Sequence, residues 1–188
     1  MQTLKMLVFL YQIVDNKIKN ECMNFKEKIE IDFLEFFKFG KFDLIRLGQT
    51  KEWILKEFPE PDSRFTGEML KNGFDIWTYG DIEFHFAGQE LFLIFSDYFK
   101  TLKGGKKLKL NKWILSDISK LNLLYVLTEL NIKGIDYKKR TDNLSVTLRL
   151  NSGVELTFEN INKTDNLSPN EFQMVAFGLV AENPNRWK

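Results

Sequence analysis

The sequence predicts an α+β fold with two tandem units, each a helix or helix pair followed by an antiparallel sheet, and a C-terminal helix. Three observations predict this fold. Apolar residues alternate with polar ones in two pairs of adjacent segments, as in hairpins with one buried face. A capped segment with helical spacing precedes each pair, and a capping box precedes the last apolar segment. The predicted boundaries are 1–22 for a candidate N-terminal extension, 23–100 for the first unit, 101–112 for a Lys-rich linker, 113–160 for the second unit, and 161–188 for the C-terminal helix and tail.

The N-terminal residues before the predicted units have two interpretations. Residues 6–14 are an apolar run after Lys5, as in a signal peptide, but no small-residue cleavage site follows them. The run is also too short to span a bilayer. Alternatively, translation starts at Met23, because a helical stripe that ends at Gly40 begins directly after this residue. The stripe consists of Phe25, Ile29, Phe33, Phe36 and Phe37.

The first unit is predicted to contain a helix, a strand and a hairpin. Thr50 is a suitable N-cap for a helix over 51–58, which Pro59 ends. Trp77 and Tyr79 alternate in the strand that follows. A hairpin then turns at residues 87–90, and its buried face is predicted to carry Ile82, Phe84, Phe86, Leu91, Leu93 and Phe95.

The second unit is predicted to repeat this order. Asn122 is a suitable N-cap for a helix over 123–130, and Gly134 leads into a strand over 135–139. The buried face of the second hairpin is predicted to carry Leu144, Val146, Leu148, Leu150, Val154, Leu156 and Phe158. Its opposite face is predicted to be a solvated surface of Ser145, Thr147, Arg149, Glu155, Thr157 and Glu159.

The last apolar segment is predicted to be a helix that packs on the sheet. Residues 168–171 form a capping box, with Pro169 at the first helical position. Phe172, Val175 and Ala176 then share one helical face, and Gly178 ends the helix.

The outer face of the first hairpin, opposite its core, is predicted to be partly apolar. Phe92 and Ile94 lie on it together with Glu83 and His85. A sheet that is apolar on both faces needs a cover. Either the C-terminal helix or the N-terminal stripe packs on Phe92 and Ile94, or these residues form a patch that binds a partner.

The sequence contains no recognisable catalytic constellation. His85, the one histidine, shares a strand face with Glu83, so the pair is either a surface ion pair or a weak metal site or acid–base dyad. Two ligands are too few for a structural zinc site, and no Ser or Cys nucleophile occurs in a known motif. The single cysteine, Cys22, excludes an internal disulfide and fits a reducing, cytoplasmic location. No cofactor, metal site or catalytic residue is predicted.

The linker between the units is rich in lysine. Leu108, Leu110 and Trp113 alternate with its lysines, which predicts an edge segment with one apolar side. Gly104 and Gly105 lack the spacing of a phosphate-binding loop. An acidic partner surface and a nucleic acid are the alternatives, but 27 basic and 26 acidic residues leave a net charge of +1, which argues against nucleic acid and anionic membranes. The lysines are Lys100, Lys103, Lys106, Lys107, Lys109 and Lys112.

Two strings in the first unit carry a resemblance to known proteins. The Leu-Gly-Gln-Thr string at 47–50 resembles the helix start of SmpA-type outer-membrane assembly lipoproteins, and tandem copies of a similar unit build the β-lactamase inhibitor proteins. With the strand at 77–86 it is also similar to uncharacterised bacterial proteins associated with toxin-immunity neighbourhoods. The second unit, with Lys-Leu-Asn at 120–122, departs from this pattern. The resemblance implies binding rather than catalysis.

These observations predict a non-enzymatic protein-binding module, of an immunity or inhibitor type, that covers the active site of a partner enzyme or toxin. The rival interpretation is a ligand-binding or metal-binding protein, or an enzyme, with a Glu83 and His85 pocket between the units. An assembly factor with an N-terminal signal is a third interpretation. The candidate contacts are Trp77, Tyr79, Glu83, His85, Phe92, Ile94, Lys103, Lys106 and Lys107.

Overall fold

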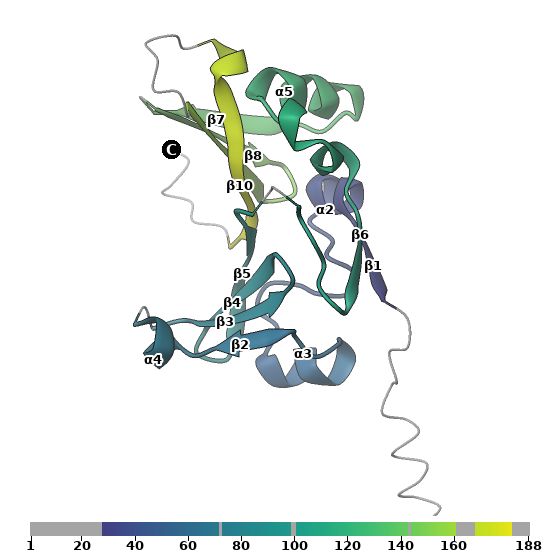
Figure 1. Ribbon diagram of the computed structural model, residues 1–188, viewed down its shortest axis with the longest axis vertical. Helices are drawn as coiled ribbons and strands as arrows, with labels where there is room; N and C mark the ends of the chain where they lie inside the picture. The colour runs from purple at the N-terminus through teal and green to yellow at the C-terminus, as the bar shows by residue number, and fades with distance from the viewer. Residues whose placement is uncertain (1–27, 72, 99–100, 143, 161–167, 182–188) are drawn as a thin grey trace, which may run out of the picture.

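The described residues form a mostly β structure, so the predicted α+β fold of two tandem units is wrong. The computed structural model describes residues 28–71, 73–98, 101–142, 144–160 and 168–181. These residues contain ten strands and four α-helices. Seven strands from the two predicted units form one antiparallel sheet together with β10. Figure 1 shows this sheet.

The strands and helices have the following bounds. The strands are β1 (Ile29–Asp32), β2 (Ser63–Phe65), β3 (Asp75–Tyr79), β4 (Ile82–Ala87), β5 (Glu90–Ser96), β6 (Leu108–Asn111), β7 (Tyr137–Thr141), β8 (Ser145–Leu150), β9 (Val154–Asn160) and β10 (Phe172–Val180). The α-helices are α2 (Phe33–Phe39), α3 (Lys51–Glu57), α4 (Gly67–Leu70) and α5 (Leu123–Ile132). The 3₁₀ helices are η1 (Trp113–Ser116), η2 (Ile118–Lys120) and η3 (Pro169–Glu171).

The predicted C-terminal helix is instead a strand, β10, in the middle of the large sheet. The strand order is β2-β3-β4-β5-β10-β9-β8-β7, so β10 lies between the two predicted units. Phe177 pairs with Ser96 of β5 on one side and with Leu156 of β9 on the other. The capping box forms only the short helix η3. Two neighbouring strands offer the segment backbone hydrogen bonds on both sides, which outweighs its local preference for a helix.

The helices α3 and α5 confirm two sequence predictions. Thr50 caps α3, since its Oγ1 accepts a hydrogen bond from the Trp53 N–H at 3.2 Å. Asn122 caps α5, since its Oδ1 accepts one from the Tyr125 N–H at 2.9 Å. A polar side chain at each N-cap thus satisfies a backbone donor that the helix itself leaves unpaired.

The N-terminal stripe is divided between a strand and a helix. α2 begins after Asp32, whose Oδ1 accepts hydrogen bonds from the N–H groups of Leu34 and Glu35. The preceding residues form β1, which pairs in parallel with β6 of the Lys-rich linker. Gly40, in a left-handed conformation, ends α2 as predicted. The apolar run at 6–14, Cys22 and the alternative start at Met23 lie outside the described residues.

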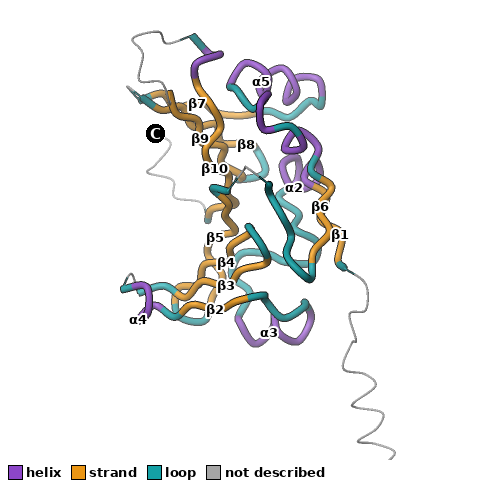
Figure 2. The backbone as a smooth tube through the Cα atoms, in the orientation of Figure 1, coloured by secondary structure: helices purple, strands orange, loops and turns teal. Residues whose placement is uncertain are grey.

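The core lies between one face of the large sheet and the layer of α2, α3, α5 and the β1–β6 pair. Figures 1 and 2 show these elements on the same side of the sheet. At its centre, the ring of Phe177 lies 5.3, 6.2 and 5.7 Å from three aromatic rings of α2. Each such ring pair adds about 0.5–1.5 kcal/mol beyond the burial of its area. The three rings belong to Phe33, Phe36 and Phe37.

The Lys-rich linker is fastened to the turn between β3 and β4. The N–H of Asp81 donates to the Lys103 carbonyl at 2.8 Å, and the Lys103 N–H donates to Oδ2 of Asp81 at 2.7 Å. Next to this pair, Oδ2 of Asp62 accepts a hydrogen bond from the Gly80 N–H at 2.8 Å. The Lys-rich linker therefore passes close to Gly80. Its apolar side chain at Leu102 is buried.

Candidate functional site

A β-bulge in the hairpin of β4 and β5 decides which side chains reach the outer face. Phe86 pairs with Leu91, but His85, the residue before Phe86 in β4, pairs with Leu93. Phe92 is therefore an additional residue in β5. Because side chains alternate along a strand, one additional residue exchanges the faces of all residues beyond it.

The bulge corrects the predicted outer face of this hairpin. Ile94 pairs with Phe84 and is 0% exposed, so its prediction as an outer-face residue is wrong. Leu93 and Phe95, which the sequence predicts for the core, lie on the outer face instead, where Leu93 pairs with His85. The predictions for Ile94 and for Leu93 and Phe95 fail for the same reason. They assume that side chains alternate strictly from Leu91 onward, and the additional residue Phe92 breaks this alternation.

The outer face of the first half of the sheet carries a continuous apolar surface, which we call the aromatic patch. The strand residues of this surface are half-buried, and Phe74 at its border is 40% exposed. The rings of Phe74 and Phe92 are in contact, with 5.0 Å between their centroids. The aromatic patch consists of Phe74, Ile76, Glu83, His85, Phe92, Leu93 and Phe95.

His85 and Glu83 form the polar centre of the aromatic patch. Nε2 of His85 lies 2.7 Å from Oε2 of Glu83. The imidazole ring packs edge-on at 6.3 Å from the Phe92 ring and 6.0 Å from the Phe95 ring. The side chain of His85 is 16% exposed and that of Glu83 is 34% exposed. Both residues belong to β4, and neither lines the pocket at the end of β10.

The described parts of the two predicted covers do not lie on this face. α2, which carries Phe33, Phe36 and Phe37 of the N-terminal stripe, packs on the opposite face. There the Phe36 ring contacts Phe42 and the Phe42 ring contacts Phe84. The segment predicted as a C-terminal helix is β10, inside the sheet. Both elements that were expected to bury the outer face therefore contribute to the core or to the sheet itself.

The short helix α4 borders the aromatic patch and is held in place by Asp75. Oδ2 of Asp75 accepts a hydrogen bond from Nζ of Lys51. Oδ1 of Asp75 accepts one from the N–H of Gly67, the first residue of α4, at 2.7 Å. The Lys51 hydrogen bond and that of Gly67 lower the pKa of Asp75 below its ordinary value. Met69 of α4 is 66% exposed and Phe65 of β2 is 37% exposed, so the apolar surface continues beyond the patch.

We expect the contribution of Asp75 to stability to depend on pH. A carboxylate with a depressed pKa stabilises the folded state fully above its unfolded pKa, about 4, and this contribution is lost as the pH falls toward the lower folded pKa. The free energy of unfolding of Asp75→Asn should therefore be lower than that of the wild type at pH 7 and approach it near pH 3. Urea unfolding at both pH values measures this difference. A pH-independent difference would contradict the assignment.

Two candidate contacts, Trp77 and Tyr79, are core residues. Trp77 is 5% exposed, and its ring lies 4.6 Å from that of Phe86. Tyr79 is 0% exposed, its hydroxyl donates to the Pro59 carbonyl at 2.8 Å, and burial raises its pKa. Neither side chain belongs to the exposed surface, so the aromatic patch is formed by other aromatic residues.

The candidate lysines lie on the opposite side of the sheet from the aromatic patch. Leu102 and Leu108 are 1% and 2% exposed and belong to the core, so the linker that carries the lysines packs on the core side. Lys103 and Lys106 point to solvent and Lys107 is half-buried. The structure does not bring these three residues together with Glu83 or His85.

The second half of the sheet has a polar outer face, but part of it is buried. Thr147 is 6% exposed and Glu155 is 5% exposed, so the prediction of a solvated surface is wrong for these residues. Nη1 of Arg149 donates to Oε1 of Glu155 at 2.8 Å. Burial of a charged side chain requires such a partner, which explains why the two occur together.

Comparisons of this chain with models of protein families, with curated proteins and with solved structures gave no match. Across the described residues, no group of three or more His, Cys, Asp or Glu could hold a metal ion. The described helices include none that is long and apolar enough to cross a membrane. The aromatic patch is therefore defined by its geometry alone.

The sequence prediction missed four members of the aromatic patch. The sequence predicts Leu93 and Phe95 for the core and predicts no site for Phe74 and Ile76. One signal points to the first two, because residues 91–95 are all apolar and lack the alternation that fixes the faces of a strand. Phe74 and Ile76 alternate with Asp75 at the start of β3, which places them together on one face.

Proposed function

We propose that this protein is a non-enzymatic protein-binding module, of an immunity or inhibitor type, that holds its partner with the aromatic patch. The bulge at Phe92 is the observation that supports this proposal most strongly, because it places Leu93 and Phe95 beside Phe92 on the face opposite the core. A contiguous exposed apolar surface with a polar centre is typical of interaction sites.

The aromatic patch has the composition of a binding centre. Aromatic side chains bring large contact areas with few rotatable bonds, and a few of them supply most of the binding energy of an interface. The Phe74 and Phe92 rings already contact each other at 5.0 Å, so little ordering is needed when a partner covers them. Exposed Phe65 and Met69 would extend the contact on one side.

The charge of the aromatic patch specifies the chemistry of the partner surface. Glu83 is the one acidic member of the patch, its side chain is 34% exposed, and no Lys or Arg belongs to the patch. The matching surface is therefore apolar with a Lys or Arg that faces Glu83. Desolvation by the surrounding apolar contacts strengthens such an ion pair, which fixes the orientation of the partner.

The proposal predicts that Phe92→Glu abolishes capture of a partner by folded protein. Wild-type protein and variants are immobilised and exposed to an extract of the native cell, and retained proteins are identified by mass spectrometry. Leu124→Glu is the matched control, because Leu124 is 48% exposed but lies on α5, on the core side. A partner bound by the aromatic patch should be retained by the wild type and by Leu124→Glu and lost with Phe92→Glu. The loss should be at least about tenfold, as expected for a hot-spot residue.

Charge reversal at the centre of the patch provides the second measurement. Glu83→Lys should weaken binding of the same partner, and a basic-to-acidic substitution on the partner should restore it. Circular dichroism confirms that each variant is folded. If wild type, Phe92→Glu and Leu124→Glu retain the same proteins in the same amounts, the aromatic patch is not the binding surface.

A further inference from the structure

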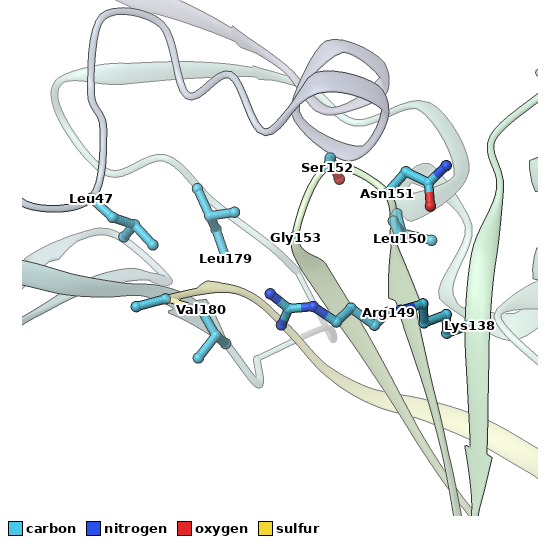
Figure 3. A pocket seen from close by; sticks show the side chains of 10 residues that line it. Leu47, Lys138, Arg149, Leu150, Asn151, Ser152, Gly153, Leu179 and Val180 are labelled. Atoms are coloured by element: carbon cyan, nitrogen blue, oxygen red, sulfur yellow. The ribbon is translucent and has the colours of Figure 1, made fainter. Parts of the chain in front are cut away.

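A pocket of about 490 Å³ lies where the second half of the sheet meets the end of β10, as Figure 3 shows. This volume is within the range of about 300–1,000 Å³ that is typical of small-molecule sites. None of its lining residues belongs to the aromatic patch. They are Leu47, Lys138, Arg149, Leu150, Asn151, Ser152, Gly153, Leu179, Val180 and Ala181.

Two cationic side chains on neighbouring strands form one wall of the pocket. Lys138 of β7 and Arg149 of β8 are directly opposite each other in the sheet. On its other side Arg149 pairs with Glu155, which accepts its hydrogen bond at 2.8 Å. Lys138 is exposed and forms no ion pair with another described residue. Because Glu155 compensates only one of the two cations, the three side chains together keep one positive charge, which an anion in the pocket would neutralise.

The facing wall of the pocket is apolar. In Figure 3 the Arg149 side chain extends toward Val180 and Leu179, and Leu47 lies on the far side of Leu179. None of the described residues that line the pocket is acidic. A ligand that is complementary to the cationic wall and to the apolar wall therefore combines a negative charge with an apolar chain.

The pocket walls are fixed by hydrogen bonds that do not depend on a ligand. Ser152 Oγ donates to the Phe37 carbonyl at 2.6 Å, which fastens the turn between β8 and β9 to α2. The Gly48 N–H donates to the Leu91 carbonyl at 2.7 Å, which fastens the loop that carries Leu47 to β5. A site with walls held in this way loses little conformational entropy on binding.

We propose that this pocket binds a small organic anion, a carboxylate on a short apolar chain. The carboxylate lies near Lys138 and Arg149, and the chain lies against Leu47, Leu179 and Val180. Arg149 is oriented by Glu155 and presents its remaining N–H groups to the carboxylate, an arrangement that favours planar anions. The site is separate from the aromatic patch and does not depend on the proposed protein partner.

Titration of the full chain with hexanoate, followed by NMR of backbone amides, tests this proposal. Hexanamide has the same shape without the charge, and acetate has the charge without the apolar chain. Hexanoate should shift the Gly153 and Val180 resonances saturably and bind at least about tenfold more tightly than either of the other probes. Equal affinities for hexanoate and hexanamide, or the absence of saturable shifts with hexanoate, would overturn the proposal.

Substitution of the unpaired lysine locates the site. Lys138→Gln should weaken hexanoate binding about fivefold or more, because it removes one of the two cations. Arg149 is kept, so Glu155 does not lose its ion-pair partner. Lys139→Gln is the matched control: Lys139 pairs with Leu148, so its side chain points to the other face of the sheet. It should leave the affinity unchanged within about twofold. Equal weakening by both substitutions would mean that general surface charge, and not the pocket, attracts the anion.

Discussion

Substitution of Ile94 by Lys is expected to prevent folding. The Ile94 side chain is 0% exposed, pairs with Phe84 on one side and with Leu179 on the other, and therefore lies in the middle of the sheet. Loss of a buried Ile side chain alone costs about 2–5 kcal/mol. A buried ammonium without a partner adds several kcal/mol, and the sum approaches the total stability of a typical domain, about 5–15 kcal/mol. Circular dichroism and urea unfolding measure the loss.

Phe92→Lys is the control that isolates the bulge. Phe92 lies two residues before Ile94 in the same strand, and without a bulge both side chains would lie on one face. With the bulge, Phe92 is on the outer face, so Phe92→Lys should fold and lose no more than about 1.5 kcal/mol. Equal losses of stability for the two variants would contradict the register of β4 and β5.

Gly80→Ala is expected to cost about 3 kcal/mol or more of the free energy of unfolding. Gly80 has a φ of +64°, and a Cβ atom there would lie closer to the Gly105 nitrogen and the Lys103 carbonyl oxygen than real Cβ atoms approach. Because these are backbone atoms, the linker has to move. Its displacement breaks the two hydrogen bonds between Lys103 and Asp81 and disturbs the buried side chain of Leu102.

Gly88→Ala is the control that measures the cost of backbone strain without a steric clash. Gly88 lies in the turn of the next hairpin with a similar φ of +60°, but no atom lies within 4 Å of the place that its Cβ would occupy. The substitution should therefore cost only the strain of a left-handed Ala, about 1–2 kcal/mol. Urea unfolding of both variants gives the difference. If the two costs are the same, the linker does not pack on the β3–β4 turn as described.

The elements that the sequence predicts correctly are those whose signals are local. Thr50 and Asn122 cap α3 and α5, and the alternation of apolar residues predicts both hairpins. β10 shows where local signals fail. The predicted capping box coincides only with the short helix η3, where the Ser168 side chain makes no cap hydrogen bond. The choice between helix and strand is made by two partner strands that are distant in sequence.

The candidate site was predicted less well than the fold elements around it. Glu83, His85 and Phe92 lie on the outer face as predicted, because β4 alternates strictly and Phe92 directly follows the buried Leu91 in β5. The five consecutive apolar residues at 91–95 fit either face, so the pattern cannot place Ile94 or Leu93. The pocket at β10 had no sequence signal at all, since its walls depend on the position of β10 in the sheet.

The central position of β10 also determines the order in which the chain can complete its fold during synthesis. β5 and β9 are both made before residues 172–180 leave the ribosome, yet each pairs with this strand along one edge. Until then the nascent chain presents two unpaired strand edges, which can pair with strands of other molecules. Because β10 joins residues separated by a large part of the chain, closure of the sheet is a late step that depends on long-range contacts. The synthesis of β10 thus decides when the two edges of β5 and β9 are protected from aggregation.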